Sequence, residues 1–275
     1  DLKSFKSTLD SVGSSWNGPS ERVGAGNEIV VKGEIVCKDV VVKFENTNAL
    51  NGLTLSIPAK AKVAVVGPSG AGKTTFLRLC QGFLRPNTGS MEIDGQNFRY
   101  LSLDNYRSQN TLIDGKPVFF GATIEENLRK VQPGISEREF QEVLEISGLQ
   151  KVLDQLPEGI STEVNQFGMP LSQGDRVTFA LARGLMSGPR ILLIDEALAH
   201  LDKSTQISFF ENFSKISELK TVIMATHDLR STAQFEQIIV LEKGVVVGHG
   251  THDELLKTCV LYQELWAMEK KLTGA

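Results

Sequence analysis

Gly-Pro-Ser-Gly-Ala-Gly-Lys-Thr-Thr occupies residues 67–75, directly after the apolar run at 63–66. A strand that runs into a glycine-rich turn and then into a helix is typical of a phosphate-binding α/β fold. Glycines let consecutive backbone N–H groups point at phosphate oxygens, because no Cβ intervenes and φ can be positive. The stretch predicts an ATP-binding loop made of Gly67, Pro68, Ser69, Gly70, Ala71, Gly72, Lys73, Thr74 and Thr75.

The end of this loop adds a charge and a candidate metal ligand. Lys73 places a positive charge beside the phosphates, and the helix that begins there directs the positive end of its dipole at them. The Thr74 hydroxyl is an oxygen ligand that can complete a Mg²⁺ shell. A merely flexible glycine turn is the alternative, and the flanking strand and helix argue against it.

Composition narrows the class of protein. The chain has 275 residues, 41% hydrophobic and 23% charged, enough for one large core or a core with a smaller lobe. Its formal net charge of -4 argues against nucleic acid as a partner and against a polybasic membrane patch. No apolar run approaches the ~20 residues of a spanning helix, so we expect the chain as given to be soluble. Cys37, Cys80 and Cys259 are far apart and predict reduced core thiols.

Hydrophobic patterning predicts strands before the loop and alternating helices and strands after a helical insertion. We expect strands at 34–44, 53–57, 62–66, 91–95, 191–194 and 221–225, a hairpin at 237–248, and helices at 75–83, 136–146, 172–186, 206–216 and 252–270.

The N-terminal residues have a different pattern. Residues 2–12 carry a helical apolar face, and residues 13–28 are rich in glycine and serine. We therefore interpret 1–33 as a helix tail and linker from a preceding segment. Residues 34–275 form the main domain, with a helical subdomain inserted at about 100–186.

Two adjacent carboxylates follow a predicted buried strand. The strand at 191–194 would deliver Asp195 and Glu196 to the carboxyl edge of the sheet, where ligands bind in open α/β folds. We expect Asp195 to hold Mg²⁺. Glu196 would polarise the water that attacks the γ-phosphate, a general-base role worth about 10² to 10⁴ in rate. In isolation such a pair is more often simply solvated, but the phosphate loop favours the catalytic interpretation.

A histidine follows the next predicted strand. His227 comes just after 221–225, where it can reach the γ-phosphate and fix the attacking water, so we expect it to be catalytic. The other histidines are expected to be solvated in loops or turns. They are His200, His249 and His252.

The order of these motifs resembles the ATPase domain of ABC transporters, over about residues 34–268. The resemblance implies a P-loop NTPase (RecA-like) core sheet with an antiparallel β subdomain and an inserted helical subdomain. Residues 171–175, Leu-Ser-Gln-Gly-Asp, resemble the family signature Leu-Ser-Gly-Gly-Gln, which implies that Ser172, Gln173 and Gly174 contact ATP held by a second subunit. The resemblance also implies a D-loop role for Asp202 and stacking of Phe44 on adenine.

Within the family the sequence resembles exporters. Residues 117–128 are similar to the exporter segment after the Q-loop, and 162–168 to the loop that contacts transmembrane helices. The resemblance implies transmembrane domains and a second ATPase domain as partners, and a location at the cytoplasmic face of a membrane.

Three positions depart from the family pattern. Gly115 replaces a glutamine that binds Mg²⁺ and relays motion to the transmembrane domains, and Gln109 is not expected to substitute for it. Gln173 replaces the first signature glycine, and Asp175 replaces the final glutamine. At an effective dielectric constant of about 20, one unfavourable charge contact at 4 Å costs about 4 kcal/mol before screening.

These departures suggest asymmetric composite ATP sites. This chain's own phosphate loop would work with a partner's intact signature, while its altered signature would face a slow site. A homodimer with two weakened sites is the alternative. Two further functions stay open: an ABC-type ATPase that clamps DNA or ribosomes without transport, and a regulatory nucleotide-binding subunit with little turnover.

Overall fold

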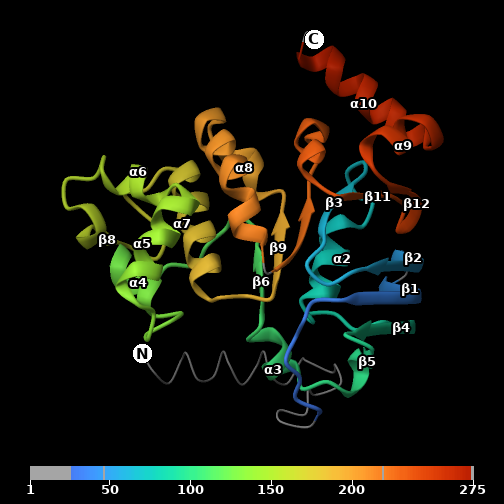
Figure 1. Cartoon of the computed structure of the whole chain (residues 1–275), viewed down its shortest axis with the longest axis horizontal. Coiled ribbons are helices and arrows are strands. Elements are labelled where there is room, and N and C mark those ends of the chain that lie inside the picture. The colour runs from blue at the N-terminus through green and yellow to red at the C-terminus, as the bar shows by residue number, and fades with distance from the viewer. Residues whose placement is uncertain (1–25, 46, 219, 274–275) are drawn as a thin grey trace.

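Two large sheets and a helical region that holds a small third sheet make up the part of the chain that the computed structural model describes, residues 26–45, 47–218 and 220–273. The helix expected at 2–12 lies outside the described residues. Figure 1 shows helices α4 to α7 at one side, the parallel strands in the middle and the antiparallel strands at the other side. This arrangement confirms the predicted α/β fold with an antiparallel subdomain and a helical subdomain.

The central sheet has the strand order β12-β11-β3-β10-β9-β6, and all but β12 are parallel. In the register of this sheet, Ala225 pairs with both Val65 and Asp195, so three carboxyl ends meet at one edge. The strands are β3 Lys62–Val66, β6 Asn110–Ile113, β9 Ile191–Asp195, β10 Thr221–Ala225, β11 Gln237–Glu242 and β12 Val245–Gly250.

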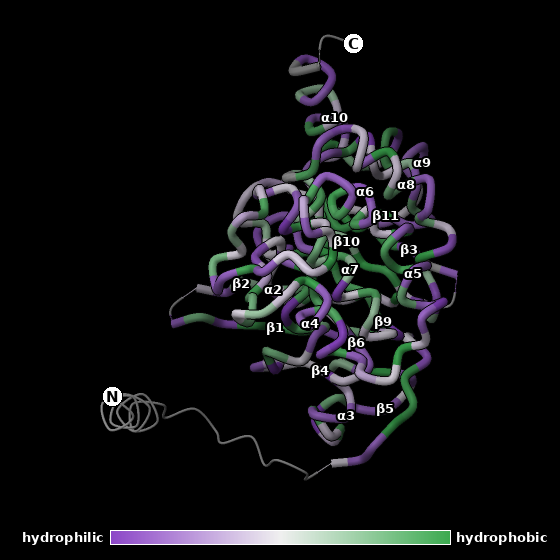
Figure 2. The backbone as a smooth tube through the Cα atoms, turned by 90° about the vertical axis from the view of Figure 1, so that its left-hand side faces the viewer, coloured by the Kyte–Doolittle hydropathy of each residue, from purple (hydrophilic) through white to green (hydrophobic). Residues whose placement is uncertain are grey.

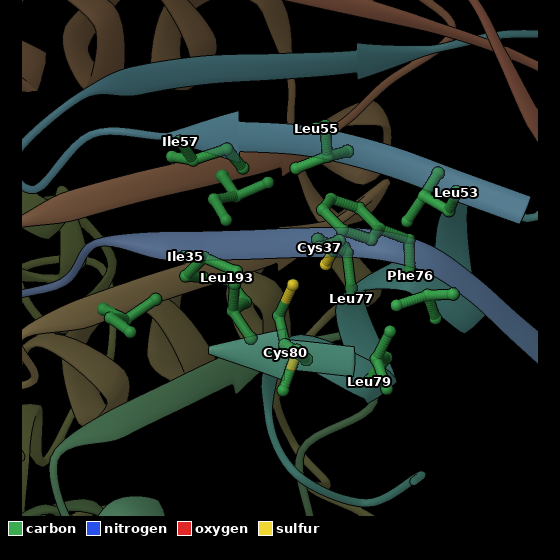
Figure 3. Packing of buried hydrophobic residues seen from close by; sticks show 14 of the residues in the cluster. Ile35, Cys37, Leu53, Leu55, Ile57, Phe76, Leu77, Leu79, Cys80 and Leu193 are labelled. Carbon is green, nitrogen blue, oxygen red and sulfur yellow. The ribbon is translucent and has the colours of Figure 1, made fainter. Parts of the chain in front are cut away.

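An antiparallel sheet, ordered β2-β1-β4-β5, covers helix α2 (Lys73–Cys80). Figure 3 shows side chains of β1 and β2 packed on Phe76, Leu77 and Cys80 of this helix. All three cysteines are buried, and burial raises the pKa of Cys37 to about 12, which makes its thiol inert. The strands are β1 Ile35–Phe44, β2 Thr47–Ile57, β4 Thr88–Ile93 and β5 Gln96–Asn97.

The helical subdomain has its own hydrophobic cluster, in which the rings of Phe119 and Phe179 lie 4.6 Å apart. The described boundary differs from the expected one, because β6 falls within 100–186 yet pairs with β9 in the central sheet. The helical part therefore begins after β6. Its elements are α4 Ile124–Arg129, α5 Glu137–Ser147, α6 Leu149–Leu153 and α7 Gln173–Met186, with the short strands β7 Ala122–Thr123 and β8 Glu163–Val164.

The C-terminal region contains two helices, α9 (His252–Thr258) and α10 (Val260–Thr273), so the single helix expected at 252–270 is wrong. Cys259 between them has extended backbone angles, φ -115° and ψ 106°, and its side chain is buried. The break lets α10 turn back, and in Figures 1 and 2 its far end extends beyond the body of the molecule. None of the described helices is long and apolar enough to cross a membrane.

Part of the expected linker is bound to the domain. Backbone N–H groups of Ile29 and Val31 donate to Asn105 of α3 (Leu103–Arg107) and to Gln109, each at 2.9 Å. The Gln109 amide also donates to the Ile29 carbonyl at 2.7 Å. These contacts commit the Gln109 side chain to the N-terminal segment, which agrees with the expectation that it does not replace the glutamine missing at Gly115.

Candidate nucleotide site

Two glycines allow the phosphate loop to pack against its neighbours. Gly67 has φ 148°, and a Cβ there would lie 2.1 Å from the Leu241 carbonyl oxygen. Gly72 has φ 105°, and a Cβ there would lie 2.6 Å from the Ala49 carbonyl oxygen. Because those contacts are with backbone atoms that cannot move aside, only glycine fits at either position. The loop is thus held between β2 and β11.

The Lys73 side chain points back into the phosphate loop. Its side chain is only 7% exposed, and Nζ donates to the carbonyl oxygens of Gly67 at 2.9 Å and Pro68 at 3.2 Å. Nζ also lies 3.3 Å from Glu196 Oε1. A buried ammonium group needs such partners, since an unpaired one would be costly to bury. The lysine charge is therefore fixed at the centre of the loop.

Thr74 and Asp195 meet across the edge of the sheet. The Thr74 hydroxyl donates to Asp195 Oδ1 at 3.2 Å. Burial raises the pKa of Asp195, although the hydrogen bond from Thr74 acts in the opposite direction. A hydroxyl and a carboxylate are both hard oxygen donors, the type that Mg²⁺ takes. Among the described residues no group of three or more His, Cys, Asp or Glu side chains could hold a metal ion.

Glu196 has an unusual backbone conformation. Its φ is 51°, in the left-handed region, and its N–H donates to the Ala225 carbonyl at 3.0 Å. For a residue with a Cβ this conformation stores about 1–3 kcal/mol, a strain that is common at functional sites. It directs the carboxylate between Lys73 and His227, whose Nδ1 lies 3.8 Å from Oε2.

A shallow pocket of about 240 Å³ lies over the loop. Its lining is residues 69–75 together with Ala49 and Glu196. Phe44, the residue expected to stack on adenine, does not line it. The Phe44 ring is 47% exposed at the end of β1, on the same β1–β2 hairpin that carries Ala49. The adenine role of Phe44 therefore stays a prediction.

The signature residues begin helix α7 and form a capping box. The Ser172 side chain accepts from Asp175 N at 3.2 Å, and the Asp175 carboxylate accepts from Ser172 N at 3.0 Å. The Asp175 charge thus lies at the positive end of the α7 dipole. The spacing Ser-x-x-Asp was visible in the sequence and could have revealed this cap.

Asp202, the expected D-loop residue, also caps a helix. Its carboxylate accepts from the backbone N–H groups of Ser204 and Thr205, at 2.9 and 3.0 Å, and begins α8 (Lys203–Ser217). The Ser204 and Thr205 hydroxyls also donate to it, and these bonds hold the pKa of Asp202 well below its usual range. Asp202 therefore has a structural reason to be aspartate, which the sequence alone did not reveal.

The structure brings together one subset of the predicted residues. Thr74 is hydrogen-bonded to Asp195, and Glu196 lies within ion-pair distance of both Lys73 and His227. The rest of the set lies elsewhere, since none of the remaining residues outside the loop lines its pocket. They are Phe44, Ser172, Gln173, Gly174 and Asp202.

The site combines a strand, a glycine-rich phosphate loop, a buried lysine and a carboxylate at a strand end. These features define a P-loop nucleotide-binding domain. The model of the ABC transporter family matches residues 50–199, and the chain belongs to that family. It corresponds to the ATPase domain of that family.

Curated relatives of this chain are named as transporters. The chain is 34% identical over 238 residues to the mitochondrial iron-sulfur clusters transporter ABCB7 of Oryzias latipes, covering 83% of this chain and 32% of that protein. It is 36% identical over 243 residues to the mitochondrial iron-sulfur clusters transporter ATM1 of Candida albicans, covering 84% and 32%. The chain thus spans about a third of these relatives.

A solved structure has the same fold. The structure of a bacterial Atm1-family ABC exporter with ATP bound superposes with a TM-score of 0.88 at 30% sequence identity. The match covers 96% of this chain and 46% of that one. The predicted ABC ATPase fold is therefore confirmed.

Proposed function

We propose that this chain powers an exporter from the cytoplasmic face of a membrane, by closing with a second ATPase domain around two ATP molecules. The observation that carries this proposal is the position of the Glu196 carboxylate, between Lys73 Nζ at 3.3 Å and His227 Nδ1 at 3.8 Å. The named relatives support it, because they are transporters that contain a domain similar to this one.

Each residue of the site has a chemical role in this proposal. The loop N–H groups and Lys73 bind the β- and γ-phosphates, where they stabilise charge that develops during transfer. When ATP enters, the phosphates replace Glu196 as the partner of Lys73. The released carboxylate then accepts a proton from the attacking water, and His227 orients that water.

Mg²⁺ fits beside the loop, with Thr74 Oγ1 and Asp195 as the protein ligands. When bound, the ion would neutralise charge on the β- and γ-phosphate oxygens. The Thr74–Asp195 hydrogen bond of 3.2 Å already aligns two oxygen donors for it. Burial raises the pKa of Asp195, which means that its charged form is destabilised here. A divalent cation bound beside it would stabilise that charged form.

The second half of each ATP site would come from another subunit. Ser172, Gln173 and Gly174 begin α7 outside the pocket that the phosphate loop forms, and would contact the partner's nucleotide. Asp175 places a carboxylate at that helix end, which disfavours a triphosphate. We therefore favour a heterodimer whose two sites differ, in which Asp202 lies at the subunit interface.

A regulatory subunit with little turnover is the second candidate, and the carboxylate at the start of α7 favours it. A clamp on DNA or ribosomes has less support, since the net charge is -4 and the named relatives are transporters.

Replacing Glu196 by glutamine tests the catalytic assignment. Glu196→Gln should lower ATP turnover by about a hundredfold or more while ATP binding is kept, because only the base is lost. Turnover and binding of a fluorescent ATP analogue would be measured in the full chain. A wild-type rate in this variant would exclude Glu196 as the base.

A further inference from the structure

The backbone on both sides of His227 is fixed by hydrogen bonds. Thr226 N donates to the Val65 carbonyl at 3.1 Å, and Thr226 Oγ1 accepts from Asp228 N at 3.0 Å. The His227 side chain itself is 64% exposed. The position of the imidazole is therefore set mainly by the main chain that precedes and follows it.

Helix α10 holds the main chain just after His227. Leu229 N donates to Glu269 Oε2 at 2.7 Å, although the two residues are 40 positions apart in sequence. The other oxygen of Glu269 lies 3.2 Å from Arg230 Nε, and the Glu269 side chain is only 14% exposed. A charge-assisted bond to a half-buried carboxylate is among the stronger hydrogen bonds in a protein. Glu269 therefore fixes the start of η4 (Leu229–Gln234).

A buried chain of hydrogen bonds joins the same point to α9. The Thr232 hydroxyl donates to the Leu229 carbonyl, and Tyr262 Oη lies 3.1 Å from Thr232 Oγ1 and 2.7 Å from His252 Nδ1. Because Thr232 uses its one proton on Leu229, Tyr262 must donate to Thr232, and His252 Nδ1 must donate to Tyr262. The Leu229 N–H is thus held by Glu269 of α10. The Leu229 carbonyl is held by Thr232, which is itself hydrogen-bonded to Tyr262 of α10.

Two neighbouring carboxyl groups, Asp228 and Glu269, have pKa values shifted in opposite directions at this contact. Burial and a hydrogen bond with Asp228 raise the pKa of Glu269. Burial also acts to raise the pKa of Asp228, but hydrogen bonds with Glu269 and Arg230 outweigh it and lower that pKa. The carboxyl groups of Glu269 and Asp228 therefore interact directly, which links α10 to the residue directly after His227.

We propose that Glu269, Tyr262, Thr232 and His252 form a C-terminal clamp that positions His227 for hydrolysis. The clamp rests on the catalytic role proposed for His227 above. Its members do not touch the nucleotide pocket, so they are positioning residues that act through the backbone of Leu229. A movement of α10 would change the position of His227, which makes α10 a route by which a partner could control turnover.

Three substitutions on α10 test the clamp by kinetics. Glu269→Ala removes the acceptor of Leu229 N and should lower turnover at saturating ATP about tenfold, with the KM for ATP unchanged. Glu269→Gln should lose less turnover than Glu269→Ala, because its amide oxygen can still accept from Leu229 N even though its NH₂ then faces Arg230 Nε. Glu264→Ala, at an exposed position of the same helix, is the matched control and should match wild type. A wild-type rate in Glu269→Ala would overturn the clamp.

The hydrogen-exchange rate of the Leu229 amide, measured in the full chain without nucleotide, tests the clamp independently of hydrolysis. The Leu229 amide should exchange about tenfold faster in Glu269→Ala and at the wild-type rate in Glu264→Ala, because only the first loses the acceptor. Unchanged exchange at Leu229 in Glu269→Ala overturns the clamp, whatever the turnover. His227→Ala separates the two claims: a wild-type rate in that variant contradicts the role of His227, while the exchange result still decides the clamp.

Discussion

The phosphate loop and the start of α7 are both helix N-termini with phosphate-binding sequences, but they differ in charge. At the loop, Lys73 is buried with its charge directed at the position of the phosphates, and no acidic residue lies in the first turn of α2. At α7, the carboxylate of Asp175 occupies the helix end and accepts from Ser172 N. From this difference we expect the start of α7 to bind an anion more weakly than the phosphate loop does, because its capping residue is itself negatively charged.

Among the substitutions that test this difference, the one at Gly67 should change stability and ATP binding most. In Gly67→Ala the new Cβ would meet the Leu241 carbonyl oxygen at 2.1 Å, so we expect a loss of about 4 kcal/mol or more of stability and of ATP binding. Gly70→Ala is the matched control, since φ is 77° there but nothing lies within 4 Å. That variant should lose about 1–2 kcal/mol in urea unfolding. Equal losses would show that packing does not shape the loop.

Asp195→Asn should lower turnover by about a hundredfold or more, because the charged ligand of Mg²⁺ is lost. Stability without nucleotide should change in the opposite direction. Burial raises the pKa of Asp195, so the folded chain binds this proton more tightly than the unfolded chain does. The stability that this group contributes is full below the ordinary pKa of aspartate and is lost as pH rises through the raised pKa.

Urea unfolding at a series of pH values tests the direction of this pH-dependent change in stability. At neutral pH and without nucleotide, Asp195→Asn should be more stable than wild type, and the advantage should disappear at acid pH. A variant that is less stable than wild type at neutral pH would mean that the Thr74 bond outweighs burial.

At the start of α7, two substitutions separate the effect of the negative charge from the effect of the helix cap. Asp175→Asn keeps an oxygen that can accept from Ser172 N but removes the negative charge, so turnover of the full chain should rise severalfold. Ser172→Ala removes the cap and should cost about 1 kcal/mol of stability without a gain in turnover. ATPase assays and thermal unfolding of both variants would test this, and unchanged turnover in Asp175→Asn would show that the charge is not limiting.

Restoring the glutamine at Gly115 should have the smallest effect. Its φ of 72° disfavours any residue with a Cβ, so Gly115→Gln should cost about 1 kcal/mol. Space is not the obstacle, since the nearest atom to a Cβ would be 3.5 Å away. A loss of several kcal/mol in thermal unfolding would contradict this.

The buried strands and the phosphate loop could be predicted from the sequence, because their signals are local. The spans of β3 and β10 agree with the predicted 62–66 and 221–225, since both are continuous apolar runs in a parallel sheet. The helix expected at 136–146 is present as α5, which Ser136 and Glu139 begin with a capping box.

Features that depend on distant partners could not be predicted. The helix break at Cys259 depends on how α10 packs, and apolar periodicity at 252–270 does not reveal it. His252 was expected to be solvated, which is wrong, because it is half-buried against Tyr262 and Trp266. Glu269 was not singled out, since its partner Leu229 lies 40 residues away.

A mixing experiment tests most directly the claim that this chain has a competent phosphate loop and a weak signature. The wild-type chain would be mixed with a Lys73→Ala, Gln173→Gly, Asp175→Gln chain, which cannot bind the phosphates but offers a repaired signature. Our account predicts turnover well above the sum of the separate chains, and no such rise with a Lys73→Ala chain whose signature is unchanged. Turnover no greater than the sum in both mixtures would contradict it.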